Sequence, residues 1–219
     1  MLRFPALRKT PKRYPQFYMR HLLAILLTLS IGFAKSQSIP NFESNTTEQE
    51  KINSLVLVKL SNEFDQIISY TNLPYRKKQW IFILGYKKGK WEFFKWTVKY
   101  TYKTGPNGNV IKVKKTIKKK KIGIDNSSID SLFAFWSQNE FWKLNNDSLN
   151  YNEKRTNDTS VELMMVYHGH YDKFEIIGKS NYRLIQSYAA DVYQKKYPNL
   201  QRQEFILCRD EFFKLIEAK

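Results

Sequence analysis

Three consecutive segments of strand character, separated by two turn signals, constrain the fold of this chain more than any other feature. The segments are 80–86, 91–102 and 110–121, and the turn sequences are KKGK at 87–90 and GPNG at 105–108. Apolar and polar residues that alternate with a period of two are typical of strands with one buried face, and Gly-Pro and Asn-Gly pairs are typical of turns. We therefore predict three antiparallel strands joined by hairpins.

The middle segment predicts which side chains face the core. One face carries its apolar residues and the other its polar ones, so that Phe94, Trp96, Val98, Tyr100 and Tyr102 oppose Lys95, Thr97, Lys99 and Thr101. Trp91 and Phe93 fall on the polar side of this register. Exposed rings among cations can stack on sugars or bases, so we predict Trp91 and Phe93 as an aromatic contact. The alternative is that both rings pack in the core.

Apolar residues at intervals of three and four predict helices elsewhere in the chain. The first covers 48–70, although the VLV run at 56–58 is also compatible with a strand. The second follows capping side chains at 125–128 and buries Ile129, Leu132, Phe133 and Trp136. The third runs from Ser180 or Asn181 to before Pro198, with Leu184, Ile185, Tyr188, Ala189 and Val192 as its apolar stripe, and the last begins near Gln203.

Short strands at 161–167 and 174–177, with an Asn- and Asp-rich loop at 144–158, complete the pattern. Runs of strands joined by hairpins and separated by helices are typical of an α+β domain. We predict an α+β fold with an antiparallel sheet of about five strands and three or four helices packed on it.

The N-terminal segment predicts export. Arg20 and His21 precede an apolar run at 22–33, and Ala34-Lys35-Ser36 has the small-x-small spacing of a signal peptidase site. The run is shorter than the roughly 20 residues of a membrane-spanning helix, although an uncleaved anchor and a buried core helix are alternatives. We predict a signal peptide at 1–36, with Met19 as an alternative start, a flexible leader at 37–47 and one domain at 48–219, in the periplasm or outside the cell.

The charge of the chain predicts an anionic partner. The net charge is +17, and one strand carries a cluster of lysines, namely Lys112, Lys114, Lys115, Lys118, Lys119, Lys120 and Lys121. Such a cluster attracts anionic polymers through counterion release. The alternative is an edge strand that uses lysines to prevent pairing with other sheets.

The histidines offer a metal-site hypothesis. His168 and His170 are two residues apart, so on an extended chain they face the same side, and Asp172 or Glu175 could supply a third ligand. The alternative is a tight turn at Gly169 with solvated histidines, and we predict no metal or other cofactor. The lone cysteine, Cys208, cannot form an internal disulfide and is predicted to be a buried small side chain.

Motifs of known enzymes are missing from the sequence. It contains neither a nucleophile elbow, nor a phosphate-binding glycine loop, nor an HExxH helix. A carboxylate pair assembled in space is the remaining catalytic hypothesis, drawn from Asp125, Asp130, Glu140, Asp147 and Asp158. Asn-x-Ser/Thr triplets occur at Asn45, Asn126, Asn146 and Asn157 and are glycan acceptors if the host modifies exported chains.

The order of a strand pair, a Gly-rich turn, a basic strand, the helix sequence IDSLFAFWSQNEFWKL, an NDTS loop and a closing hairpin resembles small exported bacterial domains of unknown function, over residues 80–195. The resemblance implies the α+β fold and no chemistry. We predict a non-catalytic binding or structural domain of the cell envelope that contacts anionic polymers or head groups through the lysine strand. The alternatives are a protein-interaction module with an exposed sheet face or edge, and an unrecognised hydrolase.

Overall fold

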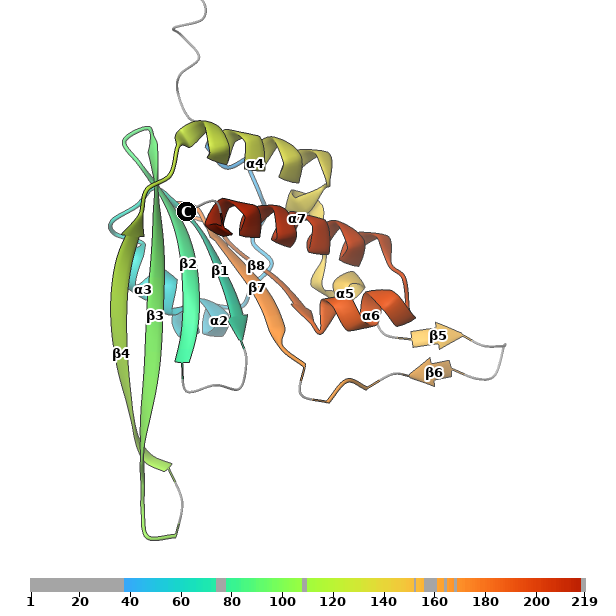
Figure 1. The fold of residues 1–219 in the computed structure, drawn as a ribbon, viewed down its shortest axis with the longest axis horizontal. Helices are drawn as coiled ribbons and strands as arrows, with labels where there is room; N and C mark the ends of the chain where they lie inside the picture. The colour runs from blue at the N-terminus through green and yellow to red at the C-terminus, as the bar shows by residue number, and fades with distance from the viewer. Residues whose placement is uncertain are drawn as a thin grey trace, which may run out of the picture. The chain divides into compact units, whose positions relative to one another are not determined.

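A six-stranded antiparallel sheet forms the centre of the structure (Figure 1). The computed structural model describes residues 38–73, 78–107, 110–151, 153–155, 161–163, 165–167 and 169–217. The sheet order is β4-β3-β2-β1-β7-β8, so β4 and β8 are its edges. Its strands are β1 Gln66–Leu73, β2 Lys78–Lys87, β3 Lys90–Thr104, β4 Val110–Ile122, β7 Tyr171–Ile177 and β8 Tyr182–Tyr188; a separate pair is β5 Glu153–Arg155 with β6 Val161–Leu163.

Helices cover both faces of the sheet. In Figure 1, α4 and α7 cross the near face and α2 and α3 lie behind it. Within the described residues, no helix combines the length and the apolar character that crossing a bilayer requires. The helices are α2 Glu48–Asn53, α3 Leu55–Leu60, α4 Asn126–Gln138, α5 Asn146–Leu149, α6 Ala190–Lys196 and α7 Leu200–Glu217, with a 3-10 turn at Phe141–Lys143.

Each face of the sheet carries a hydrophobic core, and a third, smaller cluster lies at Ala189, Tyr193 and Tyr197. The first core lies between the sheet and α4 and α7 and is rich in aromatic residues. At its centre the Trp136 ring stacks on Phe141 at 4.0 Å, and the indole N–H donates to the Cys208 carbonyl at 2.9 Å. The second core lies on the opposite face, where α3 packs on Ile81 and Trp96. The middle strands are therefore buried on both faces, with one core on each face.

The α+β class, the antiparallel pairing and the three consecutive strands are confirmed, with six strands in the sheet where about five were predicted. The second predicted helix is confirmed as α4: the Asp125 side chain accepts a hydrogen bond from the Ser127 N–H, and the four residues predicted for its buried face are buried. The last predicted helix is α7, which begins at Leu200.

Two helix predictions are wrong. The segment 48–70 is two short helices and then β1, so Ile67 and Ile68 are strand residues that enter the two different cores. The segment predicted as the third helix is β8, followed by the short helix α6. Both errors have one cause: a strand buried on both faces has consecutive apolar residues, and these also fit helical intervals.

Smaller differences concern the ends of elements. The predicted strand at 161–167 is only β6 in the described residues, and the predicted loop at 144–158 contains α5 and β5. The signal peptide, the alternative start at Met19, Asn157, Asp158 and His168 lie outside the described residues.

The two edges of the sheet are finished differently. Asparagine side chains act as a substitute strand along β8, so that its outward backbone groups have partners. The Asn45 amide pairs with both Leu184 N and O at 2.8 Å, and Asn146 accepts from Gln186 N at 2.9 Å. The Asn150 side chain accepts a hydrogen bond from the backbone N–H of Tyr188 at 3.0 Å. The β4 edge has no such cover among the described residues and carries lysines instead.

Candidate functional site

A lysine-rich area covers the part of the sheet that α4 and α7 leave open. This area is on the same face of the sheet as the first core. It consists of twelve residues of β2, β3 and β4 that follow the core residues Phe82, Phe93 and Ile122 toward the free end of the β3–β4 hairpin. We call this area the lysine face. Its members are Lys78 and Trp80 of β2; Lys95, Thr97, Lys99, Thr101 and Lys103 of β3; and Lys112, Lys114, Thr116, Lys118 and Lys120 of β4.

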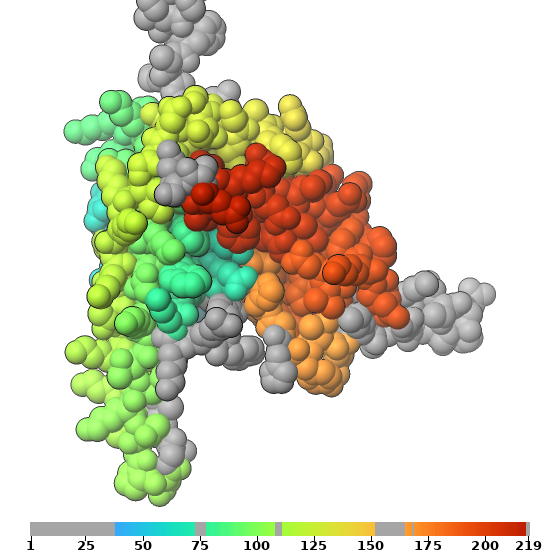
Figure 2. Space-filling view, in the orientation of Figure 1, coloured from blue at the N-terminus to red at the C-terminus, as the bar shows by residue number. Residues whose placement is uncertain are grey.

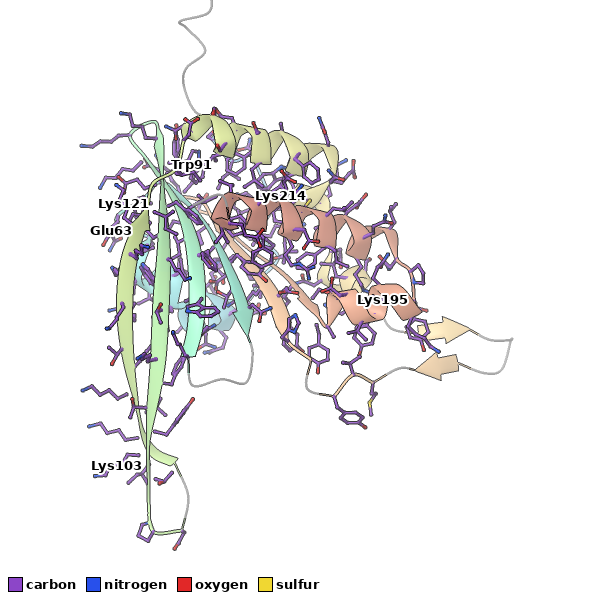
Figure 3. The ribbon with its side chains drawn as sticks, viewed as in Figure 1. Glu63, Trp91, Lys103, Lys121, Lys195 and Lys214 are labelled. Carbon is purple, nitrogen blue, oxygen red and sulfur yellow. The ribbon has the colours of Figure 1, made fainter. Side chains whose placement is uncertain are left out.

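The lysine face lies on the projecting part of the molecule. In Figures 1 and 2 the far half of the β3–β4 hairpin extends past the helices. Figure 3 places Lys103 near the free end of this hairpin and Trp91 at the opposite end, close to the start of α4. A ligand can therefore reach this face without displacing a helix.

Lysines of the lysine face lie directly opposite one another. The strand register pairs Lys78 with Lys99, Lys95 with Lys120, and Lys103 with Lys112. Like charges at directly opposite positions destabilise a sheet. The eight lysines of this face have no ion-pair partner within the described residues, and the face contains no acidic residue.

On the other face of the hairpin each of the three β4 lysines lies over an aromatic ring. The Lys119 ammonium is 4.7 Å from the Trp96 ring centre, and Lys121 is 5.9 Å from Phe94 and pairs with Glu92 at 2.8 Å. Lys115 lies over Tyr100 in the same way, at 5.5 Å. These contacts shield aromatic rings of the second core. The seven lysines predicted as one cluster thus divide into four on the lysine face and three that cover rings.

The edge-strand explanation accounts for only part of this charge. Lysines on β4 protect an open edge, and β4 is an edge strand. Lys95 and Lys99 of β3, however, have strand partners on both sides, whereas Lys78 of β2 lies beyond the last residue paired with β1 and Lys103 of β3 lies beyond the last residue paired with β2. Edge protection therefore gives no reason for Lys95 and Lys99. The sequence alone does not assign these four lysines to the site, because their proximity depends on the strand register.

The predicted aromatic contact is wrong. Trp91 is 4% exposed and Phe93 is 0% exposed, because α4 and α7 cover the face that the alternation marked as polar. Trp91 packs edge-on against Phe133 of α4 at 5.2 Å. The exposed ring of this face is Trp80, at 49%, and the Lys95 ammonium lies 4.9 Å from its centre.

A pocket of about 590 Å³ opens where the lysine face meets α7. We call it the aromatic pocket. Its size is within the range of small-molecule sites. It is lined by Tyr70, Asn72, Lys78, Trp80, Phe82, Lys95, His170 and Phe213.

Behind the aromatic pocket lies a buried charged network. The Asp172 carboxylate, 1% exposed, accepts the Tyr70 hydroxyl at 2.5 Å and the Asn72 amide at 2.8 Å, and its other oxygen accepts from Arg209 at 3.0 Å. Arg209 also donates to both oxygens of Asp191, at 2.7 and 2.9 Å. Every oxygen of the buried carboxylate is therefore in use.

Burial and charge shift the pKa values in this network. Burial, followed by the charge and hydrogen bond of Asp172, raises the pKa of Tyr70 well above its ordinary value, so its hydroxyl stays a donor. Hydrogen bonds from Arg209 lower the pKa of Asp191. Burial alone would lower the pKa of Arg209, but its bonds to Asp191 and the charge of Asp172 more than offset this and raise it. Arg209 is the cation shared by these acidic side chains, and it also lies 2.8 Å from Asp210.

The proposed metal ligands are only partly brought together. Nε2 of His170 lies 3.7 Å from Asp172, and Asp191 completes a group of three potential ligands. Arg209 bridges the two carboxylates and already supplies the positive charge that a metal ion would bring. Glu175 cannot join this group, because it lies on the opposite face, where it accepts from Ser69 and Tyr182 at 3.0 and 2.7 Å.

The structure also gives the positions of the lone cysteine and of four of the acids considered for a carboxylate pair. Cys208 is buried in the first core, and burial raises its pKa to about 12, which keeps the thiol protonated and unreactive. Of the acids considered for a carboxylate pair, Asp125 caps α4, Asp130 lies within α4, Glu140 follows α4 and Asp147 belongs to α5. Among the residues whose burial the structure describes, the buried carboxylates are instead Asp172 and Glu175.

Comparison with protein-family models, with curated proteins and with solved structures finds no match to this chain. The resemblance to small exported domains therefore stays a prediction, and the function is inferred from the geometry of the site.

Proposed function

We propose that this protein is a non-catalytic domain that binds an anionic polymer along the lysine face. The observation that carries the proposal is that Lys95 and Lys99, which have no ion-pair partner within the described residues, lie where β3 is paired on both sides. Export, predicted from residues 1–36, would place this face among the anionic polymers of the cell envelope.

The energetics of the face support an anionic partner. Three directly opposed lysine pairs repel one another, and each repulsion falls when a polymer anion lies between the ammonium groups. The threonines between the lysines add hydroxyl donors, and Trp80 adds an exposed ring. Binding of this kind is mainly electrostatic and should weaken steeply as salt rises.

A matched pair of triple variants tests the proposal. One variant, Lys114→Thr/Lys118→Thr/Lys120→Thr, removes three charges from the lysine face. The other, Lys115→Thr/Lys119→Thr/Lys121→Thr, removes three from the opposite face of the same strand. Net charge is equal in the two proteins. We expect the first variant to elute from immobilised heparin, and from polyphosphate, at clearly lower salt, with a log–log salt slope smaller by about two to three. The second should elute close to the wild type.

Equal elution of the two triple variants would show that net charge alone drives retention and would overturn the proposal. Heparin and polyphosphate distinguish a sulfated polysaccharide from a phosphate polymer. Binding to vesicles containing phosphatidylglycerol, without retention on either polymer, would also overturn it in favour of a membrane surface.

A protein-interaction role is the second candidate, and one observation favours it. Tyr102 and Val113 lie opposite each other on the other face of the hairpin and are 46% and 51% exposed. Together with the open β4 edge, they could receive an extended segment of a partner. Binding through these residues would be insensitive to salt and would be lost in Tyr102→Ser/Val113→Ser, which leaves all lysines in place.

A further inference from the structure

The aromatic pocket is a second binding element, which shares Lys78, Trp80 and Lys95 with the lysine face and adds aromatic rings from β1 and α7. Its walls are rings from three elements: Tyr70 of β1, Trp80 and Phe82 of β2, and Phe213 of α7. Tyr70 and Phe213 meet edge to face at 5.0 Å. Apolar walls of this kind exclude water and favour a planar or apolar group.

The pocket is held in shape by the charged network behind it. The Tyr70 hydroxyl and the Asn72 amide both donate to one oxygen of Asp172, which Arg209 holds from the other side. Burial and bonding fix these side chains before any ligand arrives. Because these side chains are already ordered, binding costs little conformational entropy, and this favours affinity for a small ligand.

The rim of the pocket is cationic and uncompensated. Lys95 is half-buried and its ammonium lies 4.9 Å from the Trp80 ring and 5.3 Å from the Phe82 ring. The Lys78 ammonium is 5.3 Å from the same Trp80 ring. Neither lysine has an ion-pair partner among the residues that the structure describes. A negative group on a ligand would meet both ammonium groups beside the rings.

From this combination of rings and cations we infer that the aromatic pocket binds a small molecule consisting of a planar ring with an anionic substituent. The ring lies among Tyr70, Trp80 and Phe213, and the anion lies toward Lys78 and Lys95. The inference does not require a polymer, so it stands or falls separately from the proposed function.

A matched series of naphthalene probes tests the inference in the full chain. The probes are 2-naphthalenesulfonate, which is anionic, and 2-naphthalenesulfonamide, which has the same ring and no charge; binding is followed by isothermal titration calorimetry. We expect the sulfonate to bind about tenfold more tightly than the sulfonamide, as a charged contact at a partly buried site allows.

Three single variants locate the binding. Lys95→Gln should weaken the sulfonate by about tenfold and leave the sulfonamide nearly unchanged. Trp80→Leu should weaken both probes. Lys114→Gln, on the lysine face but opposite Thr101, should change neither. Because Trp80 and Lys114 are exposed, their variants should fold normally, and circular dichroism checks this.

Equal affinity for the two probes, no binding at about 1 mM probe, or unchanged binding by Trp80→Leu would each overturn the inference. The triple variant of the lysine face keeps Lys78 and Lys95 and should therefore still bind the sulfonate. Loss of heparin retention with probe binding intact would show that the pocket binds the probe without the β4 lysines. Heparin retention without probe binding would overturn only the pocket.

Discussion

The half of the sheet that contains β7 and β8 and the half that contains β3 and β4 use charge in opposite ways. In the first half, Asp172 is buried against Arg209, and the β8 edge is closed by asparagines. In the second half, lysines face lysines across the strands and the β4 edge is open. In the first arrangement the buried acid has a cationic partner within the protein, whereas the second leaves positive charge for an external partner.

This difference indicates that the β7–β8 half of the sheet contributes mainly to stability and the β3–β4 half mainly to binding. A substitution in the β7–β8 half should affect folding first, because it leaves a buried group without its partner. A substitution on the lysine face should affect binding first, because its charges have no partner to lose within the described residues. Three stability measurements test this separation.

The largest effect is expected for Arg209→Met. The substitution leaves the Asp172 carboxylate, 1% exposed, without its cation, and removing one member of a buried pair costs about 3–5 kcal/mol. Urea denaturation measures the change in the free energy of unfolding. Lys214→Met on the same helix, where the side chain is 71% exposed, is the control and should cost less than about 0.5 kcal/mol.

The double variant Arg209→Met/Asp172→Asn sharpens this test. It removes the uncompensated negative charge and should be more stable than Arg209→Met alone. If the single variant cost no more than the Lys214→Met control, the charged network would not stabilise this half of the sheet.

An intermediate effect is expected at the β8 edge. Asn146→Ala and Asn150→Ala each remove the acceptor of an outward amide, that of Gln186 or Tyr188, and should each cost about 1–2 kcal/mol. Hydrogen exchange of these two amides, followed by NMR, should become faster in the corresponding variant. Asn62→Ala, in an exposed turn, is the control. Unchanged exchange would mean that the asparagines do not close this edge.

The smallest effect is expected from two adjacent lysines on β4. Lys119→Ala uncovers the Trp96 ring and should cost about 0.5–1 kcal/mol. Lys120→Ala relieves the repulsion from Lys95 and should change stability by no more than about 0.5 kcal/mol, toward greater stability at low salt. Thermal unfolding of the two variants at low and high salt checks the difference. Equal losses would contradict the distinction between the two faces.

Local signals explain what could be predicted from the sequence. The Asp125 cap and the spacing of Ile129 and Trp136 define α4 without any knowledge of the rest of the chain, and α4 is as predicted. The β2–β3 and β3–β4 hairpins were equally accessible, because their turns and their alternation are both local. The contiguous lysines of β4 were found for the same reason.

Long-range contacts explain what could not be predicted. Leu184 and Ile185 fit a helix as well as a doubly buried strand, and only pairing with β7 decides between them. Trp91 was assigned to an exposed face because nothing near it in the sequence shows that α4 covers it. Asp172 and Arg209 are 37 residues apart, and no local pattern connects them.

The asparagine closure of β8 also has a consequence for the order of events during synthesis. Asn45 and its partner Leu184 are 139 residues apart, so the ribosome releases Asn45 long before the strand that needs it exists. In a host that attaches sugars to nascent chains, the Asn45-Thr46-Thr47 triplet would be modified on the amide nitrogen that otherwise donates to Leu184. The choice of expression host therefore decides whether this side chain carries a sugar or completes the sheet.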